Sequence, residues 1–196
     1  MLHALRRDLL SALVAVVVVT LVLGLGYPLL VTGIGQVAFP GRADGSLVTV
    51  DGKVVGSRLL GQRFKGARWF HSRPSQSGYS ASATFFSNAG PNGADTRDAI
   101  AANARAYLKL EGRYVPTLTR AAIPPDAVQT SASGVDPHIS VANARIQAHR
   151  VAAARDLPLA RVEQLIDAHT DGRGLGVFGE PGVNVLGLNL ALEARS

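Results

Sequence analysis

An uncharged stretch from Leu9 to Gly41 dominates the hydrophobicity pattern of this chain. Its apolar part, Leu9 to Val31, would reach roughly 34 Å as a helix, which exceeds the hydrocarbon core of a bilayer at about 30 Å. Val16 to Val19 and the leucines around them leave no polar face, so a core helix of a soluble protein is disfavoured. The pattern predicts one transmembrane helix over residues 9–31.

The charges beside this helix predict its orientation. Arg6 and Arg7 flank its N-terminal end, and basic flanks tend to stay on the cytoplasmic side. Residues 1–8 are therefore expected in the cytoplasm and residues 32–196 outside it. A cleaved signal peptide also begins with basic residues, but its apolar region is usually about 7–15 residues long and ends in a small-residue cleavage motif. The longer run here favours a retained anchor.

Two pairs of small residues lie four positions apart in the predicted span: Ser11 with Ala15, and Thr20 with Gly24. This spacing lets two helices approach closely in lipid, although small residues are common in membrane helices. The pairs are candidate packing positions for another helix.

Pro28 lies near the outer end of the predicted span. Proline removes a helical donor, so we expect the helix to kink or end there, with Tyr27 at the membrane interface. The span contains no ionisable residue, which favours an anchor or an assembly partner over an ion pore.

The periodicities after the span predict one α+β domain. Leu47–Val50 and Lys53–Val55 flank Asp51-Gly52, which is a hairpin signal. Three helices are expected: 95–111, capped near Asp95 or Thr96; one from a cap at Ser140 to Asp156; and a short one with Pro158 in its first turn. In 183–193 leucines alternate with smaller residues, which predicts a half-buried strand. Residues 71–93 and 115–134 are expected to be loops.

Composition limits the chemistry that this domain can perform. The chain has no cysteine, which excludes thiol catalysis and cysteine-based metal sites. The net charge is +6, but the basic residues are scattered and form no stripe of the kind that nucleic acids require. No phosphate-binding loop motif is present, and the glycines of 172–179 precede a predicted strand, which favours an ordinary loop.

Two short motifs carry candidate functional groups. Asp136-Pro137-His138 offers one carboxylate and one imidazole, too few for a metal site or acid–base pair without distant partners, and a turn before the Ser140 helix is the better interpretation. Arg73-Pro74-Ser75 offers an exposed guanidinium beside a rigid turn, suited to a partner surface or a ligand.

Seven segments, in this order and spacing, resemble the C subunit of the bacterial Kdp-type potassium-transporting ATPase. They are YPLL, GSRLLGQRF, WFHSRPS, SNAGP, SASGVDPHIS, QAHRVAAAR and VNVLGLNLALE, and they extend the resemblance over essentially the whole chain. The residues of these segments that we take as candidate interface or family-motif positions are Tyr27, Pro28, Gln62, Phe70, Arg73, Pro74, Ser133, Gly134, Asp136, Pro137, His138, Gln147, Arg150, Asn184 and Asn189.

The resemblance implies a non-catalytic accessory subunit of a potassium uptake pump in the bacterial inner membrane. Its partners would be a channel-like potassium-binding subunit, a P-type ATPase subunit and a small single-span subunit. The complex uses ATP, magnesium and potassium, and no cofactor, catalytic residue or metal ligand is expected in this chain itself.

The family is also described as a catalytic chaperone that raises the ATP affinity of the hydrolysing subunit. ATP is cytoplasmic and the predicted domain is not, so we expect any such effect to be indirect and to pass through the membrane helices. The alternative is a membrane-anchored extracytoplasmic enzyme or ligand-binding module that uses Arg73, Asp136 and His138.

Overall fold

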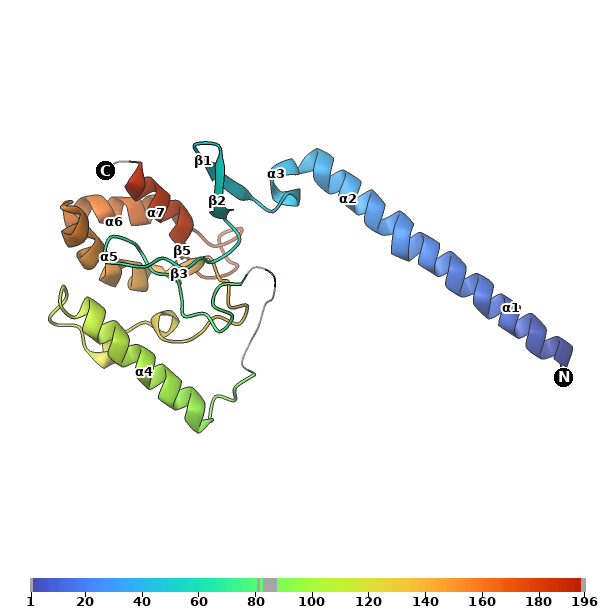
Figure 1. Cartoon of the computed structure of the whole chain (residues 1–196), viewed down its shortest axis with the longest axis horizontal. Coiled ribbons are helices and arrows are strands. Elements are labelled where there is room, and N and C mark those ends of the chain that lie inside the picture. Colours follow the sequence, from blue (N-terminus) through green and yellow to red (C-terminus); the bar gives the residue numbers. More distant parts are fainter. Residues whose placement is uncertain (1, 81, 83–87, 195–196) are drawn as a thin grey trace. The chain divides into compact units, whose positions relative to one another are not determined.

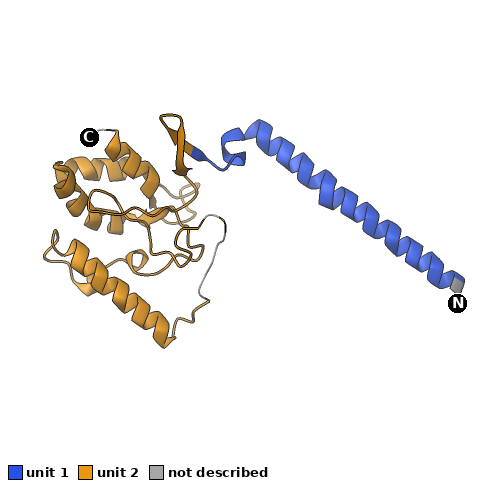
Figure 2. Ribbon diagram, in the orientation of Figure 1, with its two compact units in different colours: residues 1–47 blue, residues 48–196 orange. Residues whose placement is uncertain are grey.

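The computed structural model describes residues 2–80, 82 and 88–194, and it divides into two compact units. Residues 1–47 form the first unit and residues 48–196 the second (Figure 2). Each is described by itself below.

The first unit is a long apolar helix followed by a short one. It consists of α1 (Leu2–Val19), a π-helical stretch (Thr20–Gly26), α2 (Tyr27–Ala38) and the single turn α3 (Pro40–Ala43). The helix from His3 to Ala38 is 36 residues long, its most apolar 18-residue window has a mean hydropathy of 2.7, and it is long and apolar enough to cross a membrane. This agrees with the predicted N-terminal helix.

Pro28 does not end this helix, contrary to one outcome that the sequence suggested. It lies in the first turn of α2, where a missing N–H is tolerated, and it directly follows the widened π-helical turns. The helix ends instead at Phe39, which has an extended φ of −141° because it precedes Pro40.

The predicted hairpin consists of β1 (Leu47–Val50) and β2 (Lys53–Ser57) and lies in the second unit except for its first residue, Leu47. Asp51 and Gly52 have φ angles of 48° and 76°, as a type I′ turn requires. The hairpin prediction is confirmed.

The three predicted helices are also present: α4 (Ala94–Glu111), α5 (Val141–Arg155) and α6 (Leu159–Ala168). The Ser140 hydroxyl caps α5 by accepting the Asn143 N–H at 3.1 Å. The cap expected at Asp95 or Thr96 is wrong, because Gly93 occupies the N-cap position of α4 and makes no side-chain bond. Figure 1 shows α6 beside α7, with α4 on the other side of α5.

The strand predicted over residues 183–193 is wrong in most of its length. Only β5 (Gly182–Asn184) is extended, and α7 (Val185–Glu193) follows it. The Asn184 side chain caps this helix by accepting the Gly187 N–H at 3.0 Å. Residues 185, 186, 188, 189 and 192 are buried, a helical spacing that the alternating leucines concealed.

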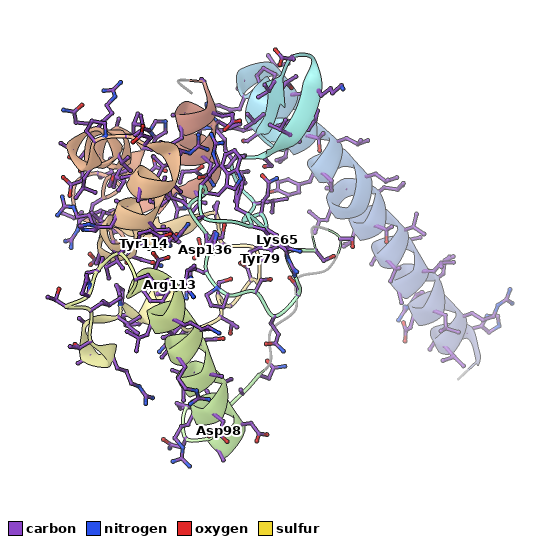
Figure 3. The ribbon with its side chains drawn as sticks, turned by 60° about the vertical axis from the view of Figure 1, so that its left-hand side comes forward. Lys65, Tyr79, Asp98, Arg113, Tyr114 and Asp136 are labelled. Carbon is purple, nitrogen blue, oxygen red and sulfur yellow. The ribbon has the colours of Figure 1, made fainter. Side chains whose placement is uncertain are left out.

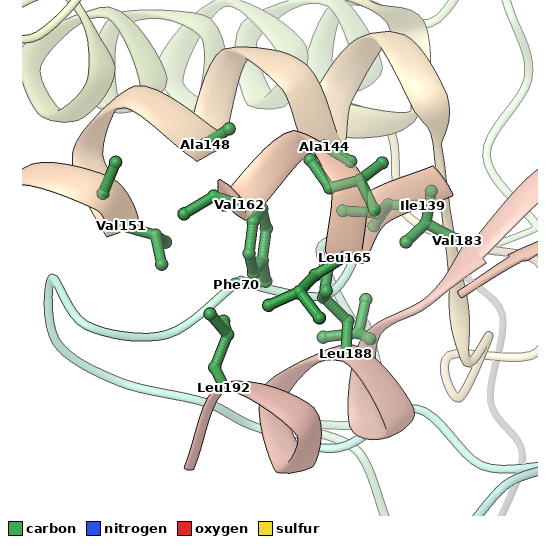
Figure 4. Packing of buried hydrophobic residues seen from close by; sticks show 13 residues of the cluster. Phe70, Ile139, Ala144, Ala148, Val151, Val162, Leu165, Val183, Leu188 and Leu192 are labelled. Atoms are coloured by element: carbon green, nitrogen blue, oxygen red, sulfur yellow. The ribbon is translucent and has the colours of Figure 1, made fainter. Parts of the chain in front are cut away.

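A small antiparallel sheet and the last three helices enclose the core. β5 lies between β3 (His138–Ser140) and β4 (Thr170–Asp171), and Ile139 pairs with Val183. The buried cluster in Figure 4 comprises Phe70, Ile139, Ala144, Ala148, Val151, Ala152, Val162, Leu165, Ile166, Val183, Val185, Leu188 and Leu192. The mixture of helices and small sheets agrees with the predicted α+β class.

Long irregular segments connect these elements. Residues 58–80, which we call the central loop, contain no helix or strand, and 115–134 contain only two short 3₁₀ turns, Arg120–Ala122 and Pro125–Ala127. Both loop predictions are confirmed within the described residues; positions 81 and 83–87 of the predicted loop 71–93 lie outside them. The glycine-rich segment 172–179 is also a loop, as predicted.

Candidate functional site

The central loop is held in place by side chains, because it has no neighbouring strand to pair with. Asn189 of α7 accepts the Phe70 N–H at 2.8 Å and donates to the Phe70 carbonyl at 3.0 Å. Gln147 of α5 forms the same pair of hydrogen bonds with His71, because it accepts the His71 N–H at 2.7 Å and donates to the His71 carbonyl at 3.1 Å. Two amide side chains therefore replace the hydrogen bonds of a strand ladder.

Arg150 holds the preceding part of the loop. Its guanidinium donates to the carbonyls of Ala67 and Trp69, both at 2.8 Å. Gln147 and Arg150 are three residues apart and therefore lie on the same face of α5. The side chains on that face form hydrogen bonds with backbone groups of the WFHSRPS motif, whose phenylalanine, Phe70, is completely buried.

Arg150 also forms a buried ion pair with Glu111, the last residue of α4. The Arg150 Nε and Glu111 Oε1 atoms are 2.9 Å apart, and the side chains are 0% and 1% exposed. Burial raises the pKa of the Glu111 carboxyl, while the Arg150 charge opposes the rise. Burying two charges costs free energy unless they are paired and hydrogen-bonded. The loop carbonyls and Glu111 together offset the cost of removing the Arg150 guanidinium from water.

A second polar group joins the start of α5 to α4 and to the 125–127 turn. Asp126 accepts the backbone N–H of Ser140 at 2.8 Å and the Asn143 amide at 2.9 Å. The Tyr107 hydroxyl donates to Asn143 Oδ1 at 2.9 Å. Burial, and next the nearby carboxylates of Glu111 and Asp126, raise the pKa of Tyr107. This group of contacts is structural, and no local sequence pattern indicates Asp126 or Asn143 as its members.

Arg73 is not the exposed guanidinium that the sequence analysis expected. Its Nη1 atom is 2.9 Å from Asp136 Oδ2, and both side chains are largely covered. The Tyr79 hydroxyl donates to the Arg73 carbonyl at 2.7 Å. Figure 3 labels Tyr79 and Asp136, which lie on the two segments that this ion pair joins.

The 131–138 segment packs against the start of the central loop and is shaped by short local contacts. Asp136 accepts the N–H of His138 at 2.9 Å, the bond of an Asx turn, and His138 then begins β3, the strand that leads into α5. Ser133 accepts the Val135 N–H at 3.2 Å, and Gly134 has a φ of 72°.

Three further backbone hydrogen bonds fix this segment. The Pro74 carbonyl accepts the N–H of Ser131 at 3.3 Å, and the Pro137 carbonyl accepts the N–H of Val185 at 3.0 Å. Gly61 donates to the Val135 carbonyl, and a Cβ at Gly61 would lie 2.3 Å from the Asp136 carbonyl oxygen. Only glycine allows the two backbones to approach this closely.

His138, the candidate metal ligand or acid–base residue, has beside it one carboxylate from a distant part of the sequence, that of Asp171. His138 Nε2 contacts the exposed Asp171 at 2.8 Å. In the part of the chain that the structure describes, no group of three or more histidine, aspartate or glutamate residues could hold a metal ion.

Gln62 and Asn184 complete the family-motif positions. The Gln62 amide donates to the Val55 carbonyl at 2.9 Å and lies against Gly56, where a Cβ would overlap it. The Asn184 amide donates to the Arg58 carbonyl at 3.0 Å, in addition to capping α7. The motif side chains in this domain thus hold its backbone segments together.

The small residues of the predicted span lie on the exposed helix of the first unit. Ser11 and Ala15 line a shallow groove on α1 together with Leu10, Val14, Val18 and Val19. Thr20 and Gly24 are neighbours in the π-helical stretch, where a Cβ on Gly24 would lie 3.6 Å from Thr20 Cγ2. Whether another helix packs on these pairs stays a prediction.

Comparison with known proteins gives a family match and several similar relatives. The family described as "KdpC: K+-transporting ATPase, c chain" matches residues 9–194. A Mycobacterium tuberculosis protein named Potassium-transporting ATPase KdpC subunit is 49% identical over 190 residues, covering 96% of this chain and 98% of the relative. Proteins with the same name from Caulobacter vibrioides and Nitratidesulfovibrio vulgaris are 52% and 49% identical over 187 residues, covering 94% of this chain and 91% and 92% of the relatives.

Proposed function

The chain belongs to the KdpC family of subunits of the multi-subunit K+-transporting ATPase, and from this premise we propose that it is a membrane-anchored, non-catalytic subunit. The proposed role of its domain is to stabilise the assembly from outside the cytoplasm. The proposed partners are a channel-like potassium-binding subunit, a P-type ATPase subunit and a small single-span subunit in the bacterial inner membrane.

The observation that carries this proposal is the long exposed helix. Between His3 and Ala38 its side chains are exposed almost throughout, although its most apolar 18-residue window has a mean hydropathy of 2.7. Such a surface is stable only in lipid or against other apolar helices. The span offers small-residue faces and no charge, which suits an anchor that packs in an assembly better than an ion pathway.

The use of the family-motif residues supports a non-catalytic role. Gln147, Arg150 and Asn189 are buried. Their polar groups form hydrogen bonds with the backbone of the central loop, and Arg150 also pairs with Glu111. The residues of the rival enzyme hypothesis are also engaged: Arg73 with Asp136, and His138 with Asp171. A catalytic site would instead direct several such groups toward one open position.

The basic N-terminal flank supports the proposed orientation. Arg6 and Arg7 favour a cytoplasmic N-terminus, and with that orientation residues 48–196 would lie on the side from which potassium is taken up. If the chain raises the ATP affinity of the hydrolysing subunit, we propose that it does so indirectly, through contacts between membrane helices.

The decisive experiment removes the domain and keeps the span. A tagged chain truncated from Arg42 onward should no longer co-purify with the other subunits from membranes or support potassium uptake, whereas the tagged full chain should do both. Wild-type uptake by the truncated chain would refute the assembly role of the domain.

The absence of native cysteine gives a clean test of orientation. Asp98→Cys lies on the exposed surface of α4 (Figure 3) and should react with a membrane-impermeant maleimide in intact spheroplasts. The matched variant Ala4→Cys should react only after the membrane is permeabilised. The reverse labelling pattern would overturn the orientation without affecting membership of the assembly.

A further inference from the structure

The C-terminal half of α4 presents basic side chains to solvent. Arg105, Lys109 and Arg113 are exposed and lie four residues apart, so they follow one side of the helix and of the turn after it. We call these three residues the basic ridge. Basic residues are scattered over the chain as a whole, but the helical repeat aligns them here.

The basic ridge has no exposed carboxylate close to it in the sequence. Residues 99–125 contain four basic residues and one acidic residue, Glu111, which is buried and paired with Arg150. Figure 3 shows Asp98 at the opposite end of α4 from Arg113. Among the described residues, none of the three ridge side chains forms an ion pair. The ridge therefore keeps its positive charge available to a partner.

The central loop adds positive charge near the same end of α4. The Arg150 guanidinium bonds both Glu111, the last residue of the helix, and the Ala67 carbonyl, at 2.9 and 2.8 Å. Lys65 and Arg68, on either side of Ala67, are exposed and form no ion pair within the described part of the chain. The cationic surface is therefore wider than one helix face.

The helix dipole explains only part of this pattern. Basic side chains in the last turn of a helix are favoured because the carbonyl groups there carry partial negative charge, and the effect fades beyond that turn. Lys109 lies in the last turn of α4, but Arg105 lies six residues before the last residue, Glu111. A partner with negative charge accounts for the rest of the pattern.

The side chains beside the ridge favour lipid phosphates over a protein surface. A protein interface usually has an apolar or aromatic centre, where lysine is depleted. Ala102 and Ala106 are the exposed neighbours of Arg105, and among the described residues 94–122 the one large apolar side chain that is exposed is Tyr114, at 36%. Polybasic segments bind anionic lipid surfaces through charge, and tyrosine is enriched at the level of the headgroups.

The membrane anchor keeps this surface close to lipid. Residues 39–46 join α2 to β1 and span at most about 28 Å when fully extended. A compact domain of about 150 residues has a radius of gyration of only about 15 Å. The domain therefore stays near the bilayer, and its faces meet the lipid surface at a high effective concentration.

We propose that the basic ridge binds the phosphate groups of anionic phospholipids in the membrane that holds the apolar helix. The inference rests on the proposed function, because it takes the membrane anchoring from it. The guanidinium groups of Arg105 and Arg113 and the Lys109 ammonium donate charge-assisted hydrogen bonds to phosphate oxygens. The lipid composition then sets how strongly the domain is held against the bilayer.

Fluorescence quenching in nanodiscs tests the contact. The full chain, which has no native cysteine, carries a dye at Ala106→Cys beside the ridge or, as the matched control, at Ala160→Cys on the exposed side of α6. Discs of phosphatidylcholine, with or without phosphatidylglycerol, contain a quencher on the lipid headgroups. The dye at position 106 should be quenched strongly only in the discs with phosphatidylglycerol, and the dye at position 160 equally in both. Raising the salt to about 1 M, where the Debye length is about 3 Å, should remove the difference.

Charge-changing variants test the ridge residues themselves. Arg105→Gln with Lys109→Gln should lower the ratio of lipid-bound to free domain about 25-fold, at about fivefold for each basic residue. Arg105→Lys with Lys109→Arg keeps the charge and should keep the ratio. Because both side chains are exposed, neither double variant should shift the denaturant midpoint of unfolding. An unchanged ratio in the glutamine variant would refute the inference.

The other outcomes identify what has failed. Equal quenching at position 106 in both kinds of disc would overturn the inference and leave the anchoring intact. Loss of this quenching in inorganic phosphate at constant ionic strength would show a site for the free anion instead of lipid. Protection of position 106 from labelling only when the other subunits are added would identify a protein occupant, which also overturns the inference. A chain that does not enter the discs would refute the proposed anchoring and the inference with it.

Discussion

Asn189 and Phe70, which are 119 residues apart in the sequence, exchange two hydrogen bonds that a β-strand partner would normally supply. The asparagine comes from the last helix and the phenylalanine from a loop that contains no regular structure. Because the Phe70 ring fills the core shared by α5, α6 and α7, the amide fixes both the backbone and the position of a core side chain.

Replacing Asn189 by leucine should destabilise the protein strongly. The change leaves the buried N–H and carbonyl of Phe70 without partners, at about 1–3 kcal/mol for each group. Denaturant unfolding of the detergent-solubilised chain, followed by the fluorescence of Trp69, the single tryptophan, measures the change. Asn92→Leu, at an exposed turn position, is the control and should shift the midpoint little. A similar midpoint for both variants would contradict the prediction.

Arg150→Met should also be severely destabilising, by about 3–5 kcal/mol, because it leaves Glu111 as an unpaired buried carboxylate. The loop carbonyls of Ala67 and Trp69 lose their donor as well. The same fluorescence titration applies. Arg145→Met on the exposed side of the same helix removes only a 3.7 Å surface pair with Asp167 and should cost less than about 1 kcal/mol. Comparable losses at both positions would show that Arg150 does not have the proposed structural role.

Acid should weaken the domain through His71. Burial, and next the Arg150 charge, lower the pKa of His71 below its usual 6.5, although a bond to the Gly66 carbonyl opposes this. The unfolded chain therefore takes up this proton first, so the contribution of His71 to stability is complete above pH 6.5 and is lost as the pH falls below it, by at most about 1.4 kcal/mol per pH unit.

His71→Gln should flatten this dependence, and the comparison is between variants because Glu111 acts in the opposite sense. The raised pKa of the Glu111 carboxyl adds stability at low pH that is lost as the pH rises. His3→Gln, at the N-terminal end of α1, is the control and should keep the slope of the unmodified chain. The measurement is the free energy of unfolding between pH 5 and 7, values chosen to bracket the onset of the effect; an unchanged slope for His71→Gln would refute it.

Gly61→Ala should destabilise by about 3 kcal/mol, at the upper end of the usual cost of overpacking. The added Cβ would lie 2.3 Å from the Asp136 carbonyl oxygen, and two backbones would have to separate. Gly172→Ala, where no atom lies within 4 Å of the added Cβ, is the matched control and should be tolerated. Thermal unfolding of both variants checks the difference, and equal midpoints would contradict it.

Local signals in the sequence predicted most of the elements. The Asp51-Gly52 turn, the Ser140 cap and the end of the predicted helix at residue 111 each depend on a few adjacent residues, and each is present. The strand prediction for residues 183–193 was wrong because the leucines alternate as in a strand, although most of the segment is the helix α7. Asn184 is the residue that signals the helix, as a side chain able to cap it.

The contacts of the central loop could not be predicted from local patterns. Arg73 looks exposed beside Pro74, but Asp136, which pairs with it, is 63 residues away. Glu111 looks like an ordinary solvated residue at a helix end, and only the packing of α4 against α5 places it beside Arg150. Arg150 follows Gln147 by three residues, so both side chains lie on one face of a helix. This spacing is the one sequence signal that could have indicated the network.

The bonds between Asn189 and Phe70 also determine when the domain can fold during synthesis. The apolar helix leaves the ribosome first, and the amide that secures Phe70 is made 119 residues after Phe70 itself. At about 5–20 residues per second, this delay is roughly 6–24 s. The helix can therefore enter the membrane while the rest of the chain is still unfolded, and an unfolded chain is the form that can be threaded across a bilayer. Under the proposed orientation, a core that is completed only when α7 is made would keep the preceding part of the domain in a transportable form until then.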